Sequence, residues 1–297
     1  MKEKTNSIAK SAIRDVYAGA LADIIEEKRV PLFAREILPR ITNLDGVDVA
    51  TRHIVYIKHF FDGKALITDL RPNTVPTLAD DGIPTTIPLK WISFGVRTDI
   101  NELDDIKTGK VYPLNRTEQA FRIVAETEND FLLKGFEKLG LKGFVSEGHQ
   151  GIHVVTASKT WETATGEEIV GDILKMKVAM ETGKKFVART LVLPEKLDFI
   201  LERPYTSKAG ETITDAKSIR EVLIGRKYFA NIKGVIGIET AMGLDDIPSN
   251  MGFIDVLPLS IGKEYEEGRA TITPIEEKIS EFALIQPEAV VKLTGAI

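Results

Sequence analysis

The chain contains 297 residues, 43% of them hydrophobic and 28% charged, and its formal net charge is −5. This composition predicts a globular protein with a sizeable core, and the acidic balance argues against a protein whose main task is to grip nucleic-acid phosphates. Cysteine does not occur, which excludes disulfides, thiol nucleophiles and cysteine metal sites. No apolar run approaches a membrane span and the first residues lack the apolar core of a signal peptide, so we expect a protein made and used inside a cell or released by lysis.

The first fifty residues are predicted to form an amphipathic helix followed by an irregular tether. Apolar residues, Ile24 and Ile25 among them, recur near helical spacing from Asn6 to about Lys28, and Pro31 ends the pattern. Such a helix either packs on its own subunit or reaches onto a neighbouring one, and the residues alone leave both alternatives open.

Residues 51–100 are predicted to form an extended loop that projects from the body. The runs RHIVYIKHFF and KALITDL are typical of strands, and Asp62-Gly63 between them favours a tight turn. A proline-rich return over 71–88 and a further β-rich run over 89–100 follow; prolines do not occupy central strands. Because projecting apolar hairpins are usually covered by a partner, we predict assembly contacts at Phe60, Phe61, Asp62, Gly63 and Trp91, together with Ile24 and Ile25.

A long helix over Tyr112–Gly140 is the element around which the chain is organised. Asn115 and Glu118 have the spacing of a capping box, and Gly140 supplies the left-handed residue that ends a last turn. At 1.5 Å per residue the predicted helix is roughly 36 Å long. Its apolar stripe comprises Ala120, Phe121, Val124, Ala125, Phe131, Leu132, Phe136 and Leu139.

The segment from about Glu167 to Thr240 indicates an α/β unit. A second capping box at 165–168 opens a helix through about Glu181, and the run 186–193 is typical of a buried strand. Pro194 begins another helix, Asp215 is the expected cap of a further short one, and residues 232–238 form a strand. The remaining β-rich runs, 253–259, 270–275, 278–285 and 289–293, are expected to pair with the sheet beneath the long helix.

The sequence shows no motif of catalysis, phosphate binding or metal binding. His149 and His153 have i,i+4 spacing, but Gly151 lies between them and the motif lacks glutamate. We therefore predict a structural protein that is not an enzyme and holds no cofactor or metal. Two alternatives stay open: an α/β enzyme that uses carboxylates such as Glu195 or Asp198, and a nucleic-acid-binding module, which the net charge disfavours.

Several stretches together resemble the encapsulin and tailed-phage major capsid superfamily, with its Hong Kong 97-type shell fold. They are VRTDINELDDIKTG, EQAFRIVAETENDFLLKGFEKLGLKGFVS, RTLVLPEKLDFILE, FIDVLPLSI and FALIQPEAVVKL. These stretches cover roughly the last two thirds of the chain in the order of the family. The set is fairly specific, although no single stretch is diagnostic.

The resemblance implies an α+β subunit in four parts: an N-terminal helix and arm (1–50), an extended loop (51–100), a peripheral domain with a spine helix (101–160 and 260–297) and an inserted axial domain (161–259). Such subunits assemble into closed icosahedral shells in which arms and loops overlap their neighbours.

The expected partners are further copies of the chain and a weakly, non-specifically held genome, with no membrane. A viral or provirus capsid protein, assembled in the cytoplasm into a virion, is favoured because residues 35–70 look like the arm and loop of a phage capsid protein. The alternative is the shell of a cytoplasmic encapsulin nanocompartment that encloses a cargo enzyme, although this N-terminus does not match the encapsulin pattern.

Overall fold

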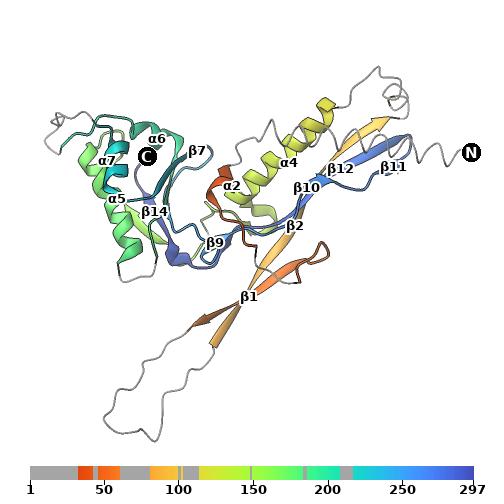
Figure 1. Cartoon of the computed structure of the whole chain (residues 1–297), viewed down its shortest axis with the longest axis horizontal. Helices are drawn as coiled ribbons and strands as arrows, with labels where there is room; N and C mark the ends of the chain where they lie inside the picture. Colours follow the sequence, from red (N-terminus) through yellow and green to blue (C-terminus); the bar gives the residue numbers. More distant parts are fainter. Residues whose placement is uncertain are drawn as a thin grey trace, which may run out of the picture.

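The structure is a computed structural model that describes residues 33–42, 46–60, 81–99, 102, 114–147, 149–182, 186–207 and 217–297. The predicted N-terminal helix therefore lies outside the described residues. Two units follow one another along an elongated molecule (Figure 1). We call them the spine unit, built on helix α4 and its sheet, and the axial unit, built on a second sheet with helices α5, α6 and α7. Among the described helices, none is long and apolar enough to cross a membrane.

The spine helix α4 extends over Leu114–Lys134 and is shorter than predicted. It ends at Gly135, whose φ of +79° is left-handed, and a short hairpin with an intervening 3₁₀ turn follows. Gly140 is also left-handed, with φ +66°, but it closes the 3₁₀ turn rather than the helix. The predicted capping box at the start stays a prediction, because the side chain of Asn115 lies outside the described residues. The hairpin consists of β3 (Gly135–Phe136), η1 (Glu137–Leu139) and β4 (Leu141–Lys142).

The sheet of the spine unit is antiparallel, with strand order β1-β2-β12-β10 and β11 paired with β12. Helix α4 packs on it through buried Phe121 and Val124, which meet Val96 and Ile275 of the sheet. Apolar α4 residues recur at helical spacing, and the middle of β12 buries Thr273, Ile275 and Glu277 in alternation, so each element presents one face to this contact. The strands are β1 (His53–Phe60), β2 (Asp81–Asp99), β10 (Asp255–Ile261), β11 (Tyr265–Glu267) and β12 (Ala270–Ser280).

Strand β1 pairs with the proline-containing start of β2, and the run KALITDL, which the sequence analysis places after a tight turn, lies outside the described residues. The register joins His53 to Pro88 and Phe60 to Asp81. The Leu89 amide faces β1 and donates to Arg52 O. Because backbone amides alternate in direction along a strand, the nitrogens of Pro84 and Pro88 face away from β1. The prolines therefore remove no hydrogen bond between the two strands. The predicted turn at Asp62-Gly63 lies outside the described residues.

The axial unit contains a mixed five-stranded sheet, in the order β5-β14-β8-β6-β7, that is buried on both faces. Leu191 and Leu193 of β6 pack in the core formed with α5, α6 and α7, whereas Val192 between them faces the core shared with the spine unit. This explains why the predicted strand 186–193 is almost wholly apolar. The strands are β5 (His153–Thr156), β6 (Thr190–Pro194), β7 (Asn231–Val235), β8 (Ala241–Leu244) and β14 (Val290–Thr294). The helices are α5 (Gly166–Glu181), α6 (Glu195–Ile200) and α7 (Ile219–Arg226).

Two predictions for the axial unit are wrong in their details. The last strand β14 pairs with β5 and β8 of the axial sheet, not with the sheet beneath the spine helix. Helix α7 begins after Ser218, which forms a capping box with Glu221, so Asp215 is not its N-cap. The helix opened by Thr165 is confirmed, including its capping box. The predicted domain boundaries stay predictions.

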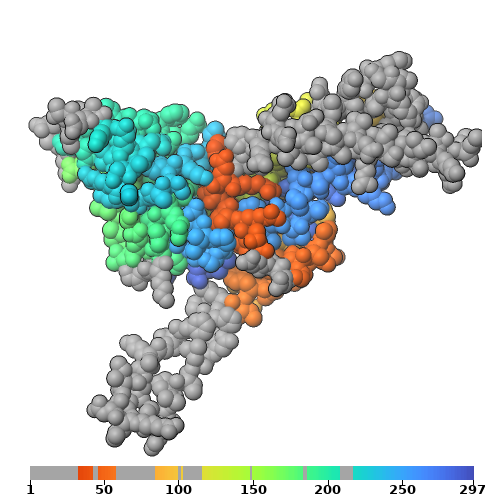
Figure 2. All heavy atoms as spheres, viewed as in Figure 1, coloured from red at the N-terminus to blue at the C-terminus, as the bar shows by residue number. Residues whose placement is uncertain are grey.

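Residues 33–42, which we call the arm, lie at the junction of the two units (Figure 2). The arm contains helix α2 (Phe33–Ile37), and its Ala34, Ile37 and Leu38 are at most 2% exposed. They join a core with Leu132 at the end of α4 and Met242 of the axial sheet. A small sheet of β9 (Met251–Gly252) and β13 (Ala283–Leu284) lies nearby in this core, and η2 (Pro287–Ala289) precedes β14.

Candidate assembly surface

The β1–β2 ribbon, by which we mean β1 with residues 81–88 of β2, extends away from the body (Figure 1). Strand β12 pairs with β2 only over Leu89–Asp99, so the described part of the ribbon contains just two strands. An isolated pair of strands is marginally stable in water. One face of the ribbon packs on the body, where Ile87 shares a buried cluster with Ile254, and the opposite face is left for another partner.

One face of the ribbon is apolar and exposed. Ile54 and Tyr56 turn inward and pack against buried residues that include Ile87. Val55 and Ile57 alternate with them and are 53% and 54% exposed. These two residues are not among the contacts predicted from sequence. The strand HIVYIKHF has apolar residues on both of its faces, and this pattern could have indicated a second, uncovered apolar face.

Trp91 lies on β2 where the ribbon joins the sheet, and it is 46% exposed. Its partner across the strand pair is Lys278, whose Nζ lies 5.3 Å from the centre of the indole ring. The same ammonium group donates hydrogen bonds to Val49 O and Thr51 O. Lys278 thus ties the chain segment before β1 to the sheet, and Trp91 covers its charge.

The other predicted contact residues are only partly placed by the structure. The backbone of Phe60 ends β1 opposite Asp81, and its side chain lies outside the described residues. Phe61, Asp62 and Gly63 also lie outside them, as do Ile24 and Ile25. Phe60 lies on β1 and Trp91 lies on β2 beyond its pairing with β1, and for all seven residues the assembly role stays a prediction.

The arm is anchored to its own subunit by backbone bonds on both sides. Ile41 N donates to Phe253 O at 2.8 Å, and Phe253 N donates to Pro39 O at 3.2 Å. Ala34 N donates to Asn129 Oδ1 of the spine helix at 3.0 Å. Of the two alternatives for the N-terminal region, packing on its own subunit therefore holds from residue 33 onward.

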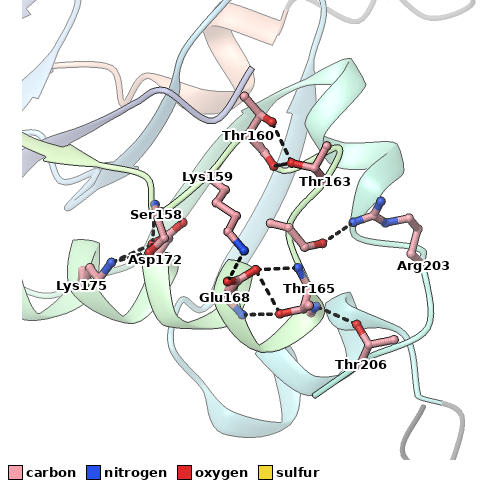
Figure 3. Close-up of polar contacts among 12 residues, drawn as sticks. Ser158, Lys159, Thr160, Thr163, Thr165, Glu168, Asp172, Lys175, Arg203 and Thr206 are labelled. Carbon is pink, nitrogen blue, oxygen red and sulfur yellow. Dashed lines mark hydrogen bonds and ion pairs between the residues drawn. The ribbon is translucent and has the colours of Figure 1, made fainter. Parts of the chain in front are cut away.

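A polar network at the start of α5 fastens the preceding loop to that helix (Figure 3). The buried Asp172 accepts hydrogen bonds from Ser158 N and Oγ and pairs with Lys175 Nζ at 2.9 Å. Glu168 completes the capping box, and hydrogen bonds from Lys159 and then from Thr165 lower its pKa to about 2. These contacts satisfy each charge, which indicates a structural network.

Arg203 holds the same loop from the other side. Its guanidinium donates to the carbonyl oxygens of Trp161, Glu162 and Ala164 at 2.9–3.0 Å (Figure 3). The planar guanidinium matches several acceptors at once. The loop before α5 is therefore fixed by side chains from two helical regions.

Of the two carboxylates considered for an enzyme, Asp198 has a structural partner and Glu195 lies in the first turn of a helix. Asp198 pairs with Arg220 of α7, linking α6 to α7, and Glu195 opens α6. His149 lies outside helices; its Nε2 is 2.7 Å from Gly143 O, and burial lowers its pKa. Within the described ranges, no three histidine or acidic side chains are grouped to hold a metal ion.

Similarity to known proteins identifies the family and the fold of this chain. Residues 63–243, more than half of the chain, match the family described as "Major capsid protein". No curated protein matches the chain.

Solved structures share the fold at low sequence identity. A chain from the capsid of Myoviridae phage XM1 has a TM-score of 0.65 at 15% identity, covering 86% of this chain and 89% of that chain. The virus-like particle from Pyrococcus furiosus has a TM-score of 0.59 at 17% sequence identity, covering 94% of this chain and 98% of that chain. The capsid of the native GTA particle has a TM-score of 0.60 at 13% sequence identity, covering 90% of each chain.

The spine helix on its antiparallel sheet, the projecting ribbon and the axial unit define a subunit with the Hong Kong 97-type shell fold. The chain belongs to the major capsid protein family, whose members are the subunits of viral shells. Its role is structural, and it associates with further copies of itself.

Proposed function

We propose that this protein is the major subunit of an icosahedral shell made by a virus or provirus, that the shell encloses the genome, and that the β1–β2 ribbon lies across a neighbouring subunit. The observation that carries the proposal is the exposed apolar face of the ribbon at Val55 and Ile57, opposite the face by which Ile54 and Tyr56 pack on the body. Membership of the capsid family supplies the class of assembly in which such a ribbon has a partner.

The ribbon has the chemistry of a contact between copies of one chain. Burying the exposed parts of two branched apolar side chains contributes on the order of 1 kcal/mol each. That is little for one interface, but a closed shell repeats the contact in every subunit, so small losses accumulate. The predicted contacts at Phe60, Phe61, Asp62 and Gly63 would extend the same surface.

The test is the double substitution Val55→Thr with Ile57→Thr. Threonine keeps the branched shape and the strand preference, so the subunit should keep its circular dichroism spectrum. We expect the yield of particles to fall at least several-fold, measured by sedimentation and negative-stain microscopy.

The matched control exchanges the two residues, Val55→Ile with Ile57→Val, and keeps the apolar area almost unchanged. It should assemble as the wild type does. Equal particle yields from the threonine variant and the wild type would show that the ribbon face is not an interface.

An encapsulin shell would use the same kind of subunit contact and would differ in its contents. The net charge of −5 is compatible with an inner surface that holds a genome weakly and without sequence preference. Nucleic acid in purified particles, protected from nuclease, supports the viral proposal, and a co-purified folded enzyme supports the alternative.

A further inference from the structure

Four charged side chains meet where the arm crosses the spine helix and its sheet. Arg35 of the arm contacts Glu128 of α4 at 2.6 Å, Asp255 of β10 at 3.2 Å and Glu277 of β12 at 3.7 Å. The three carboxylate side chains are at most 2% exposed, and that of Arg35 is 30% exposed. We call these four residues the arm cluster.

The positive charge in the arm cluster does not match its negative charge. A second guanidinium, that of Arg40, lies 3.6 Å from Asp255 but is half exposed. Even if Arg40 is counted in full, three carboxylates face two guanidinium groups among the described residues, so one negative charge in this buried place has no cationic partner there. Burying an unpaired charge is costly, and a carboxyl group avoids the cost by keeping a proton.

Glu277 is the carboxyl group whose position favours the protonated form. Its contact with Arg35 is the longest of the three, and neither of its oxygens has a hydrogen-bond partner among the described residues. Its strand neighbour on β2 is the apolar Ile92. Burial, and then the charge of Glu128, raise the pKa of Glu277 to about 8, and burial also raises the pKa of Glu128.

We propose that the arm cluster is a proton-dependent lock that fastens the arm to the spine unit. With a proton on Glu277, two carboxylates face two guanidinium groups and the charges balance. When that proton is lost in the closed state, a buried negative charge is left beside Glu128 and Asp255. The lock concerns one subunit, so it holds or fails independently of shell assembly.

The direction of the pH dependence follows from proton binding. In this proposal, opening of the arm admits water to Glu277. Burial is the largest cause of its raised pKa and outweighs the lowering by Arg35, so on opening the pKa falls from about 8 toward the ordinary value of 4.5, and the closed state binds more protons than the open state within this window. The closed arm is therefore favoured fully at the acidic end of this window. Opening should increase by up to about tenfold per pH unit across it and level off above about pH 8. The buried Ala34, Ile37 and Leu38 keep the arm mostly closed throughout, so transient opening is the quantity to measure.

Hydrogen exchange of the arm amides tests the lock in the full-length chain. Leu38 N and Ile41 N are suitable reporters because they donate to Ala34 O and Phe253 O in the closed arm. After correction for the intrinsic pH dependence of exchange, wild-type protection should fall at least tenfold between pH 6 and 8. Glu277→Gln has no titrating group at this position, so protection should fall much less over the same range than in the wild type.

The control is Glu276→Gln on the adjacent residue of β12, whose side chain points to the opposite face of the sheet. It should retain the wild-type pH profile. All samples are compared in the same assembly state, checked by sedimentation. A flat wild-type profile, or parallel profiles for wild type and Glu277→Gln, would overturn the lock.

If Glu277→Gln fails to fold, the wild-type protein still decides the question by infrared spectroscopy. The lock requires the band of a protonated carboxyl group at pH 7 and its loss as the pH rises to 9. The absence of that band at pH 7 overturns the proposal.

Discussion

At the end of the spine helix, two glycines bring the backbone of the helix terminus against the strand that follows. A β-carbon on Gly143 would lie 2.2 Å from Gly135 N, and one on Gly135 would lie 2.4 Å from Leu141 O. The obstructing atoms are backbone atoms, so they cannot move aside as a flexible side chain can. Leu132 and Leu133, which accept hydrogen bonds from Phe144 N and Val145 N, add to the same contact.

Gly143→Ala should therefore destabilise the unassembled subunit by at least about 2 kcal/mol, measured by urea unfolding followed by circular dichroism. The control is Gly171→Ala within α5, where a β-carbon meets no described atom within 4 Å. That change should be neutral or should stabilise by up to about 1 kcal/mol. Similar unfolding midpoints for the two variants would contradict the close backbone contact.

The charged residues of the arm cluster could not have been identified from sequence. Arg35, Glu128, Asp255 and Glu277 are far apart along the chain, and each alone is an ordinary surface residue type. Only the pairing of β12 with β10 and the crossing of the arm over α4 bring them together. These residues are buried only by contacts between elements that are distant in the sequence.

Among the elements, α5 was the easiest to predict because its signals are local. The capping box of Thr165 and Glu168 marks its start, and Ile169, Ile173, Met176 and Met180 form one buried stripe. Each signal lies within a few residues of the structure it specifies. The helix boundaries could therefore be read from the chain alone.

Thr165→Ala should lower the free energy of unfolding by about 1 kcal/mol, because it removes the oxygen that accepts from Glu168 N. Thr165→Ser keeps that oxygen and should retain most of the stability. The two variants can be compared by urea unfolding. An equal loss in both would indicate that the methyl group of Thr165, and not its cap, supports the helix.

Strand pairing was predicted less well, for a physical reason. The Asp62-Gly63 turn signal favoured a local hairpin, but β1 finds its partner in residues 81–88, where the two prolines face away from it. Likewise, β14 joins the axial sheet because Val291 and Leu293 fill its helical core. Apolar alternation shows that a strand has a buried face but does not show which sheet contains it.

At the scale of the whole molecule, the arm joins the two units and the ribbon reaches beyond them. Residues of the arm, the spine helix and the axial sheet share one core, so the described body should move largely as a unit. The ribbon leaves that body with an apolar face uncovered. This division suits a subunit whose rigid body sets the geometry of a shell while its extension secures the neighbour.

The overall architecture could be predicted from sequence, but the exposed apolar face of the ribbon could not. The resemblance of several stretches to capsid proteins indicated the fold, and the family match confirms that resemblance. The contacts predicted at Phe60 and Trp91 stay predictions, whereas the exposure of Val55 and Ile57 became visible only in the structure. Exposure depends on what else covers a strand, and a single strand pattern does not contain that information.

Negative-stain microscopy of the purified full-length protein after size-exclusion chromatography shows directly whether the chain forms a shell. The absorbance ratio at 260 and 280 nm of the leading fraction reports the contents. We expect closed particles of uniform size, with a ratio that indicates nucleic acid if the shell encloses a genome. A small discrete oligomer at every protein and salt concentration would contradict it.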